Sequence, residues 1–229
     1  MSADPPAIEL RELTRYFGER AALRGITASA ATGTTLAVLG RNGAGKSTLL
    51  RILATLLRAH GGQLSLLGEP LPRRAYVVRA RLGYLGHEPL LYRDLSGREN
   101  LRYHARLHRV AQARVEELLD AVQMRERADD PVRLLSRGMV QRLAVCRAVL
   151  HQPALLLLDE PRASLDPGAE ALVEPLIGRG AGLTRVLTSH DPKAALGEAD
   201  LVLGLREGRA SFLAEPGQLR PDQLEALYR

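Results

Sequence analysis

Residues 40–48 read Gly40-Arg41-Asn42-Gly43-Ala44-Gly45-Lys46-Ser47-Thr48 and match the pattern G-x-x-x-x-G-K-[S/T] of a phosphate-binding loop. An apolar, strand-like run at residues 36–39 precedes this loop, and a helix-like stretch at residues 47–57 follows it. The glycines allow the tight turn that brings backbone N–H groups close to phosphate oxygens, and the positive end of the following helix favours an anion. The sequence therefore predicts that the chain binds a nucleoside triphosphate.

Two side chains of this loop have the chemistry for specific roles. Lys46 is expected to reach the β- and γ-phosphates, and Ser47 is expected to offer its hydroxyl to Mg²⁺. The other loop residues expected at the nucleotide are Gly40, Asn42, Gly43, Ala44, Gly45 and Thr48. A glycine-rich turn before an ordinary helix is the alternative, but it leaves the placement of Lys46 and Ser47 unexplained.

A second motif indicates what happens to the nucleotide. The unbroken apolar run at residues 155–158 is typical of a strand covered on both faces, and it ends in Asp159 and Glu160. Asp159 is expected to hold Mg²⁺, partly through water, and Glu160 to act as the base for the attacking water. An acidic pair that merely caps a turn is the alternative, but with a phosphate loop upstream hydrolysis is the better interpretation.

Three further segments resemble motifs of ABC ATPases. The run Leu135-Ser136-Arg137-Gly138-Met139-Val140-Gln141-Arg142 is similar to the signature L-S-G-G-Q-x-Q-R of that family, with Arg137 and Met139 as departures. Ser164-Leu165-Asp166 resembles the D-loop, and Thr188-Ser189-His190-Asp191 resembles the segment that carries the switch histidine. The resemblance runs from Leu10 to about Arg206 and implies that Asp166 contacts nucleotide and that His190 is catalytic, together with Glu160 and Lys46.

The signature also predicts assembly. Ser136 is a good N-cap, and Gly138 allows close approach of a ligand to the helix that follows. In ABC ATPases this helix faces the γ-phosphate of the ATP held by the other protomer. The resemblance therefore implies an ATP-dependent homodimer in which Ser136 and Gly138 complete the site of the partner.

His87 marks the largest departure from the family. It follows the short strand-like run at residues 82–86, where the family usually has a glutamine. A neutral imidazole offers one donor and one acceptor, so His87 is a candidate for contact with nucleotide and Mg²⁺, with Glu88 as the alternative. The stretch at residues 84–101 resembles the ATP-binding subunit of haem exporters in cytochrome c maturation, which implies haem as one candidate substrate.

Phe17 lies well upstream of the phosphate loop, where the family places an aromatic ring against adenine. Stacking on a base contributes roughly 1–3 kcal/mol, and the chain has few aromatic side chains for this role. Tyr16 is the alternative, and a core position for Phe17 is a second one.

Composition limits the remaining possibilities. The chain of 229 residues is 45% apolar, enough for one domain with a buried core, and no segment approaches the roughly 20 apolar residues of a membrane helix. Residues 1–6 lack the apolar part of a secretory signal, and Cys146 is the only cysteine, which together predict a cytoplasmic compartment. The resemblance to ABC transporters further implies a position at the cytoplasmic side of the cell membrane. The net charge of +6 comes almost entirely from dispersed arginines, so no nucleic-acid partner is expected.

These observations predict an α/β fold of the phosphate-loop type: a mixed, largely parallel sheet, an antiparallel β lobe and a helical lobe. We expect one domain at residues 1–229, with the core and β lobe at residues 1–86 and 152–229 and the helical lobe at residues 87–151. The resemblance implies an ATP hydrolase that drives export through a separate membrane-spanning permease. The alternatives are another small-molecule, drug or lipid exporter, or a soluble ABC ATPase of repair or translation.

Overall fold

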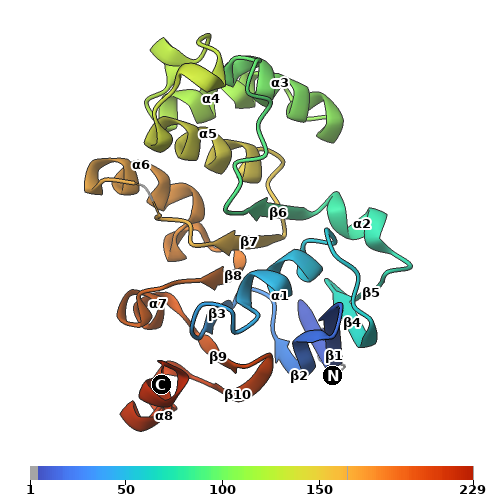
Figure 1. Ribbon diagram of the computed structural model, residues 1–229. Coiled ribbons are helices and arrows are strands. Elements are labelled where there is room, and N and C mark those ends of the chain that lie inside the picture. The colour runs from blue at the N-terminus through green and yellow to red at the C-terminus, as the bar shows by residue number, and fades with distance from the viewer. Residues whose placement is uncertain (1–4, 164, 229) are drawn as a thin grey trace.

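The computed structural model describes residues 5–163 and 165–228 of the chain; Ser164, the first residue of the predicted D-loop, lies outside the described residues. Two sheets and a group of helices make up the molecule (Figure 1). The helical group stands at one end, beyond β6 and β7, and the antiparallel sheet lies beside α1 at the other.

The larger sheet has six strands in the order β10-β9-β3-β8-β7-β6. Its strands span Leu82–Leu85 (β6), Leu155–Asp159 (β7), Thr184–Thr188 (β8), Thr35–Leu39 (β3), Leu201–Arg206 (β9) and Arg209–Ala214 (β10). Strands β6, β7, β8, β3 and β9 pair in parallel, and β10 pairs with β9 in the antiparallel sense. Every residue of β3, β7 and β8 is buried. In β3 and β7 this agrees with their largely apolar sequences, whereas β8 buries the polar side chains of Thr184, Arg185 and Thr188.

The smaller sheet is antiparallel and has the strand order β2-β1-β4-β5. Its strands span Ile8–Phe17 (β1), Arg20–Ala30 (β2), Gly61–Leu66 (β4) and Glu69–Leu71 (β5). Alternating side chains of β1 and β2 enter one hydrophobic cluster with α1 and one face of the larger sheet. The predicted β lobe is therefore packed on the strand and helix that flank the phosphate loop.

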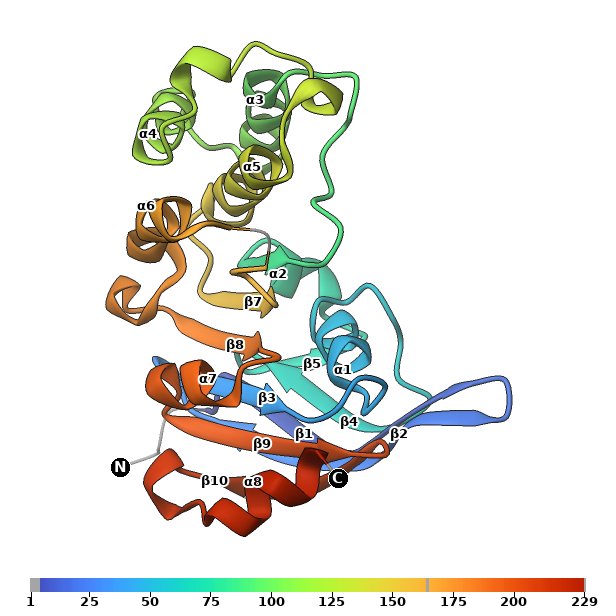
Figure 2. The same ribbon diagram turned by 60° about the vertical axis from the view of Figure 1, so that its left-hand side comes forward.

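Helices cover the larger sheet on both faces (Figure 2). Those attached to the core are α1 (Lys46–Leu53), α2 (Ala75–Arg79), α6 (Pro167–Ile177), α7 (Pro192–Glu198) and α8 (Pro221–Tyr228). Short 3₁₀ turns occur at Arg125–Arg127, Val132–Leu134, Arg179–Ala181 and Pro216–Gln218. Successive residues of β7 point to opposite faces, so Leu155 and Leu157 pack with α1 and the smaller sheet, whereas Leu156 and Leu158 pack towards α5.

The helical group consists of α3 (Gly97–His108), α4 (Ala113–Ala121) and α5 (Arg137–Val149). Ser96 and Glu99 form a capping box at the start of α3, with each side chain bonded to the backbone of the other. The buried apolar residues of α4 belong to one hydrophobic cluster with α5, and Cys146 of α5 is buried in the same cluster. Burial raises the pKa of the Cys146 thiol to about 12, which leaves it an unreactive core side chain.

The structure differs from the sequence expectations at two helix ends. Helix α1 ends at Leu53, earlier than the expected residue 57, because the N–H groups of Leu56 and Leu57 turn back to the carbonyl of Arg51 and Thr55 takes a left-handed backbone. After Gly208 the chain forms β10 and α8, neither of which the sequence predicted. No helix in the described part of the chain is both long and apolar enough to cross a membrane.

Candidate functional site

The phosphate-binding loop connects the end of β3 to the start of α1 at the carboxyl edge of the parallel strands. Gly40 adopts φ 146°, and a Cβ there would come within 2.2 Å of the carbonyl oxygen of Leu205. Gly45 adopts φ 110°, and its Cβ would meet the carbonyl oxygen of Ala22 at 2.7 Å. Both positions therefore require glycine, for the backbone conformation and for the close approach of neighbouring strands.

Lys46 is buried, and its ammonium group is held inside the loop. Nζ donates hydrogen bonds to the carbonyl oxygens of Gly40 at 2.7 Å and Arg41 at 3.1 Å. Burial lowers the pKa of Lys46, and the charges of Glu160 and Asp159 oppose that shift. The cation is thus held by the loop and near the acidic pair of β7, a position suited to an anion bound in the loop.

Ser47 and Asp159 come together although they lie far apart in the sequence. The Ser47 hydroxyl lies 3.3 Å from Oδ1 of Asp159, and that same oxygen accepts a 2.6 Å hydrogen bond from Thr188 Oγ1. A hydroxyl and a carboxylate are oxygen ligands of the kind that Mg²⁺ prefers, so this pair fits a magnesium ion that also binds nucleotide phosphate. Asp159 and Thr188 are both buried, which keeps the carboxylate oriented.

Glu160 and His190 face each other across the ends of β7 and β8. Oε2 of Glu160 lies 3.7 Å from Nδ1 of His190, and both side chains remain open to solvent, with exposed fractions of 34% and 74%. Glu160 takes a left-handed backbone with φ 51°, and its N–H donates to Thr188 Oγ1 at 3.1 Å. Glu160 thus lies at the turn directly after β7, with its carboxylate near His190.

A cavity of about 330 Å³ lies over the phosphate loop. Phe17, Arg20 and Glu160 line it together with the loop residues Asn42, Gly43, Gly45, Lys46, Ser47 and Thr48. Phe17 is 47% exposed, and the Arg15 guanidinium lies 4.8 Å from the centre of its ring. Tyr16, the alternative to Phe17, instead stacks on His60. Ala44 is buried in the hydrophobic core, and its carbonyl accepts from the N–H of Gly208.

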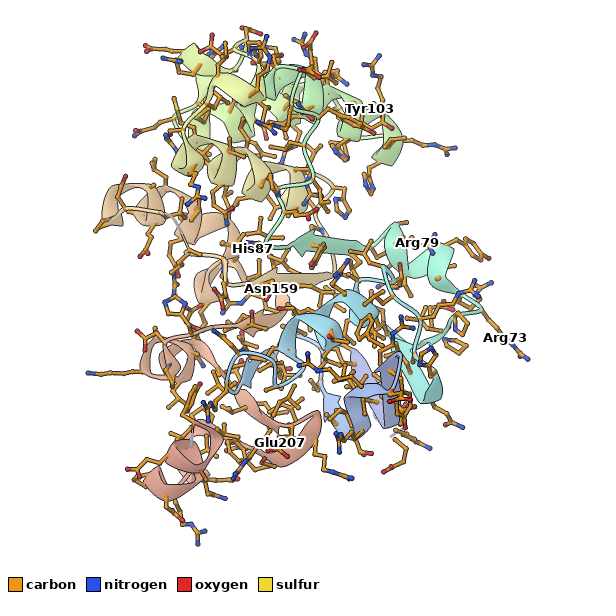
Figure 3. The ribbon with its side chains drawn as sticks, viewed as in Figure 1. Arg73, Arg79, His87, Tyr103, Asp159 and Glu207 are labelled. Carbon is orange, nitrogen blue, oxygen red and sulfur yellow. The ribbon has the colours of Figure 1, made fainter. Side chains whose placement is uncertain are left out.

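His87 lies at the junction between the core and the helical group, close to Asp159 (Figure 3). It lines a second cavity, of about 450 Å³, whose wall also contains Gln141, Asp159 and Glu160. The structure thus brings His87 towards the acidic pair, while the residues described around the phosphate-loop cavity do not include it. The alternative, Glu88, is exposed and lines neither of these two cavities.

Ser136, Gly138 and Asp166 are placed at helix starts. Ser136 is the N-cap of α5 and accepts from the N–H of Met139 at 3.3 Å. Asp166 is the N-cap of α6 and accepts from the N–H of Ala169 at 2.8 Å. Ser136 and Asp166 are exposed, and none of the three residues is among those described around the phosphate-loop cavity.

The sequence reasoning missed two residues of this site. The sequence pattern assigned no role to Thr188 beyond its place in the segment that carries His190. In the structure its hydroxyl bonds to both the carboxylate of Asp159 and the backbone N–H of Glu160. A hydroxyl at the end of a strand neighbouring the acidic strand was the available signal. Arg20 lines the cavity beside Phe17, and its guanidinium lies where a Cβ on Gly43 would contact it. No local motif marked this arginine.

Comparison with known proteins agrees with this geometry. The ABC transporter family description matches residues 23–163, which is more than half of the chain. The chain belongs to the ABC transporter family, and its fold is that of the phosphate-loop ATPase domain of this family.

Particular relatives can be named. The chain is 38% identical to a daunorubicin resistance ATP-binding protein of Streptomyces coeruleorubidus, over 89% of this chain and 66% of that protein. It is 34% identical to a Nod factor export ATP-binding protein I of Sinorhizobium fredii, over 95% of this chain and 65% of the relative. A solved structure of an ATP-binding subunit of an ABC transporter matches with a TM-score of 0.86 and 26% identity, covering 97% of this chain and 98% of the other. The chain spans just under two thirds of the length of these two curated relatives.

Proposed function

We propose that this chain binds ATP with Mg²⁺ and hydrolyses it, as the ATP-binding subunit of an ABC exporter. The observation that carries the proposal is the meeting of Ser47 with Asp159, which places a hydroxyl and a carboxylate beside the buried ammonium of Lys46. Loop backbone, cation and magnesium ligands then surround one position suited to a triphosphate.

Each residue has a distinct task in this proposal. Lys46 neutralises phosphate charge, and Ser47 with Asp159 would hold Mg²⁺, which draws phosphate oxygens together and offsets their charge. Thr188 keeps one oxygen of Asp159 oriented. Phe17 supports the adenine from the open side of the cavity, where Arg20 adds a second cation.

Glu160 is the proposed base, and His190 its neighbour. Glu160 lines both the phosphate-loop cavity and the cavity that contains His87, so its carboxylate can reach a water on the phosphate side. His190 lies within 3.7 Å of that carboxylate, from where it can orient either the base or the terminal phosphate. His87 is a weaker candidate for contact with nucleotide or Mg²⁺, because it lines a cavity with Asp159 but does not line the phosphate-loop cavity.

Assembly forms the second part of the proposal. The helix starts at Ser136 and Asp166 are exposed and separate from the phosphate-loop cavity, which supports their use by a second copy of the chain. We propose one ATPase domain at residues 1–229 with a helical lobe at residues 87–151, acting at the cytoplasmic side of a membrane with a permease subunit as partner.

Support for a transported substrate comes from the names of relatives and not from the residues of the site. The two relatives reported above are named for daunorubicin resistance and for Nod factor export, which supports export of a small organic molecule. The resemblance at residues 84–101 implies haem as a substrate, but neither name mentions haem. Haem is therefore the less favoured substrate.

The proposal is tested by ATP binding and hydrolysis of the purified chain with Mg²⁺. We expect Lys46→Ala to weaken ATP binding strongly, because a buried cation that faces phosphate is lost. Lys193→Ala, at the exposed start of α7, is the matched control and should bind as the wild type does. Wild-type affinity in Lys46→Ala would remove this loop from the nucleotide site.

A further inference from the structure

The segment from Glu160 to Asp166 connects the proposed base to the N-cap of α6. Among its described residues, the N–H of Ala163 donates to the carbonyl of Glu160 at 3.0 Å, and the N–H of Leu165 donates to the carbonyl of Arg162 at 3.2 Å. These bonds are local. The position of the segment relative to the sheet therefore depends on side chains that reach other elements.

Arg162 makes such contacts with two helices. Its Nη2 donates to Oε2 of Glu174 in α6 at 2.8 Å, and its Nη1 donates to Oε1 of Glu198 at the end of α7. One planar guanidinium thus spans two carboxylates, a geometry for which lysine has no equivalent. The chain just after Glu160 is tied to both helices that follow the acidic strand and the His190 strand.

The carboxylate of Glu198 is itself fixed to the core. Its second oxygen accepts from Nη1 of Arg185 at 3.2 Å, and the Arg185 side chain is only 1% exposed. Arg185 also donates to the carbonyl of Ile177 at 2.6 Å and to the hydroxyl of Thr35 at the start of β3. Arg162 therefore reaches, through Glu198, the strand that leads into the phosphate loop.

The opposite side of the segment is held by the signature helix. Nε2 of Gln141 in α5 donates to the carbonyl of Pro161 at 3.1 Å. The residues that follow Glu160 are thus anchored between the helical group on one side and the Arg162 contacts on the other. Loss of Arg162 would remove the contacts with Glu174 and Glu198 and leave the hydrogen bond from Gln141 in place.

We propose that Arg162 is a positioning residue for Glu160, which deepens the proposed function and rests on it. Glu160 is a non-glycine residue at φ 51°, a conformation that persists when surrounding contacts hold it. Arg162 lies two residues further along and fixes the backbone that carries this turn. Its loss lets the Glu160 carboxylate leave the place where it meets His190, and small misplacements of a base reduce turnover strongly.

The test compares steady-state ATP hydrolysis of Arg162→Ala and Arg162→Lys with that of the wild type and of Glu160→Gln. We expect Arg162→Ala to lower kcat about 10-fold with KM and ATP affinity unchanged, because the loop that binds ATP is untouched. Arg162→Lys, which keeps the charge but loses the fork, should recover only part of the loss. Glu174→Gln removes the charge of one of the two carboxylate partners of Arg162 and should give a smaller decrease.

Arg179→Ala is the matched control, since Arg179 forms an ion pair with Asp200 at 2.7 Å away from the proposed base. It should retain wild-type kcat, and thermal unfolding of every variant shows whether the fold is kept. A wild-type kcat in Arg162→Ala, with Glu160→Gln inactive, would overturn the role of Arg162 and leave the proposed function standing. Wild-type hydrolysis by Glu160→Gln would instead overturn the role of Glu160 itself. A parallel rise in KM or a loss of ATP binding in Arg162→Ala would also contradict the inference, as would full recovery by Arg162→Lys.

Discussion

The hydroxyl of Thr188 donates a 2.6 Å hydrogen bond to the carboxylate of Asp159, and these two residues are register partners at the ends of adjacent parallel strands. The same hydroxyl accepts from the N–H of Glu160 at 3.1 Å. One buried side chain of β8 therefore orients both members of the acidic pair of β7. The proposed metal ligand and the proposed base share a single support.

Thr188→Val keeps the shape of this side chain and removes the hydrogen bonds. We expect a loss of about 1.5–3 kcal/mol in the free energy of unfolding, measured by urea denaturation, because a buried carboxylate and a backbone N–H lose their partner. ATP hydrolysis should fall as well. Thr184→Val is the control: its hydroxyl accepts from the N–H of Gly33 at the other end of the same strand, so stability should fall while hydrolysis is retained.

Glu160→Gln should bind ATP as the wild type does and should turn over at least ~100-fold more slowly, because an amide cannot accept the proton of the attacking water. Binding and hydrolysis are measured on the same preparation, in the presence of the partner subunit where it is required. Unchanged turnover would show that another group supplies the base.

Dimerisation should be visible by light scattering when hydrolysis is blocked. With ATP and Mg²⁺, Glu160→Gln is expected to double its mass, since each protomer would supply Ser136 and Gly138 to the nucleotide of the other. Adding Ser136→Arg should abolish the dimer by placing a bulky cation at the start of α5. A strict monomer at high protein concentration would mean that a different subunit completes the site.

The surface near His87 and Tyr92 is the expected contact for the permease. Tyr92 and Leu90 are exposed, with fractions of 54% and 44%, and the cavity beside His87 joins this surface to the acidic pair. Single cysteines placed here and in the cytoplasmic loops of the permease should form cross-links. If every such pair fails in a complex that still hydrolyses ATP, the partner docks elsewhere.

Stability should decrease in mild acid because of two histidines near the junction of the helical group and the core. Burial lowers the pKa of both the His104 and the His151 imidazole from 6.5 to about 4. The next largest cause is the charge of Arg147 for His104 and that of His108 for His151. Below pH 6.5 these two histidines bind protons in the unfolded chain but stay neutral in the folded chain until the pH approaches 4. Their contribution to the free energy of unfolding should therefore be constant above pH 6.5 and decrease towards pH 4.

Urea denaturation at a series of pH values measures this effect. The variants His104→Gln and His151→Gln should each flatten the decrease, because each removes one imidazole with a lowered pKa. A pH-independent free energy of unfolding between pH 4 and 6.5 would contradict the prediction.

The sequence alone was sufficient for features that depend on neighbours along the chain. The phosphate loop, the buried strand before Asp159 and the N-cap at Ser136 are all local patterns, and the structure contains the expected turn, strand and helix start. The order of these motifs also carried the family, which the match over residues 23–163 establishes. A phosphate loop can be recognised from sequence because its glycines and its lysine act within one short stretch of backbone.

Contacts between distant parts of the chain were decided only by the tertiary structure. Thr188 meets Asp159 because β8 pairs with β7 in one register, and a shift by one residue would turn the hydroxyl to the other face. Arg20 joins the phosphate-loop cavity because β2 packs over α1. Arg162 reaches Glu198 because the end of α7 lies beside the residues that follow the acidic strand. Such contacts follow from strand order and packing, which bring together residues that no local spacing connects.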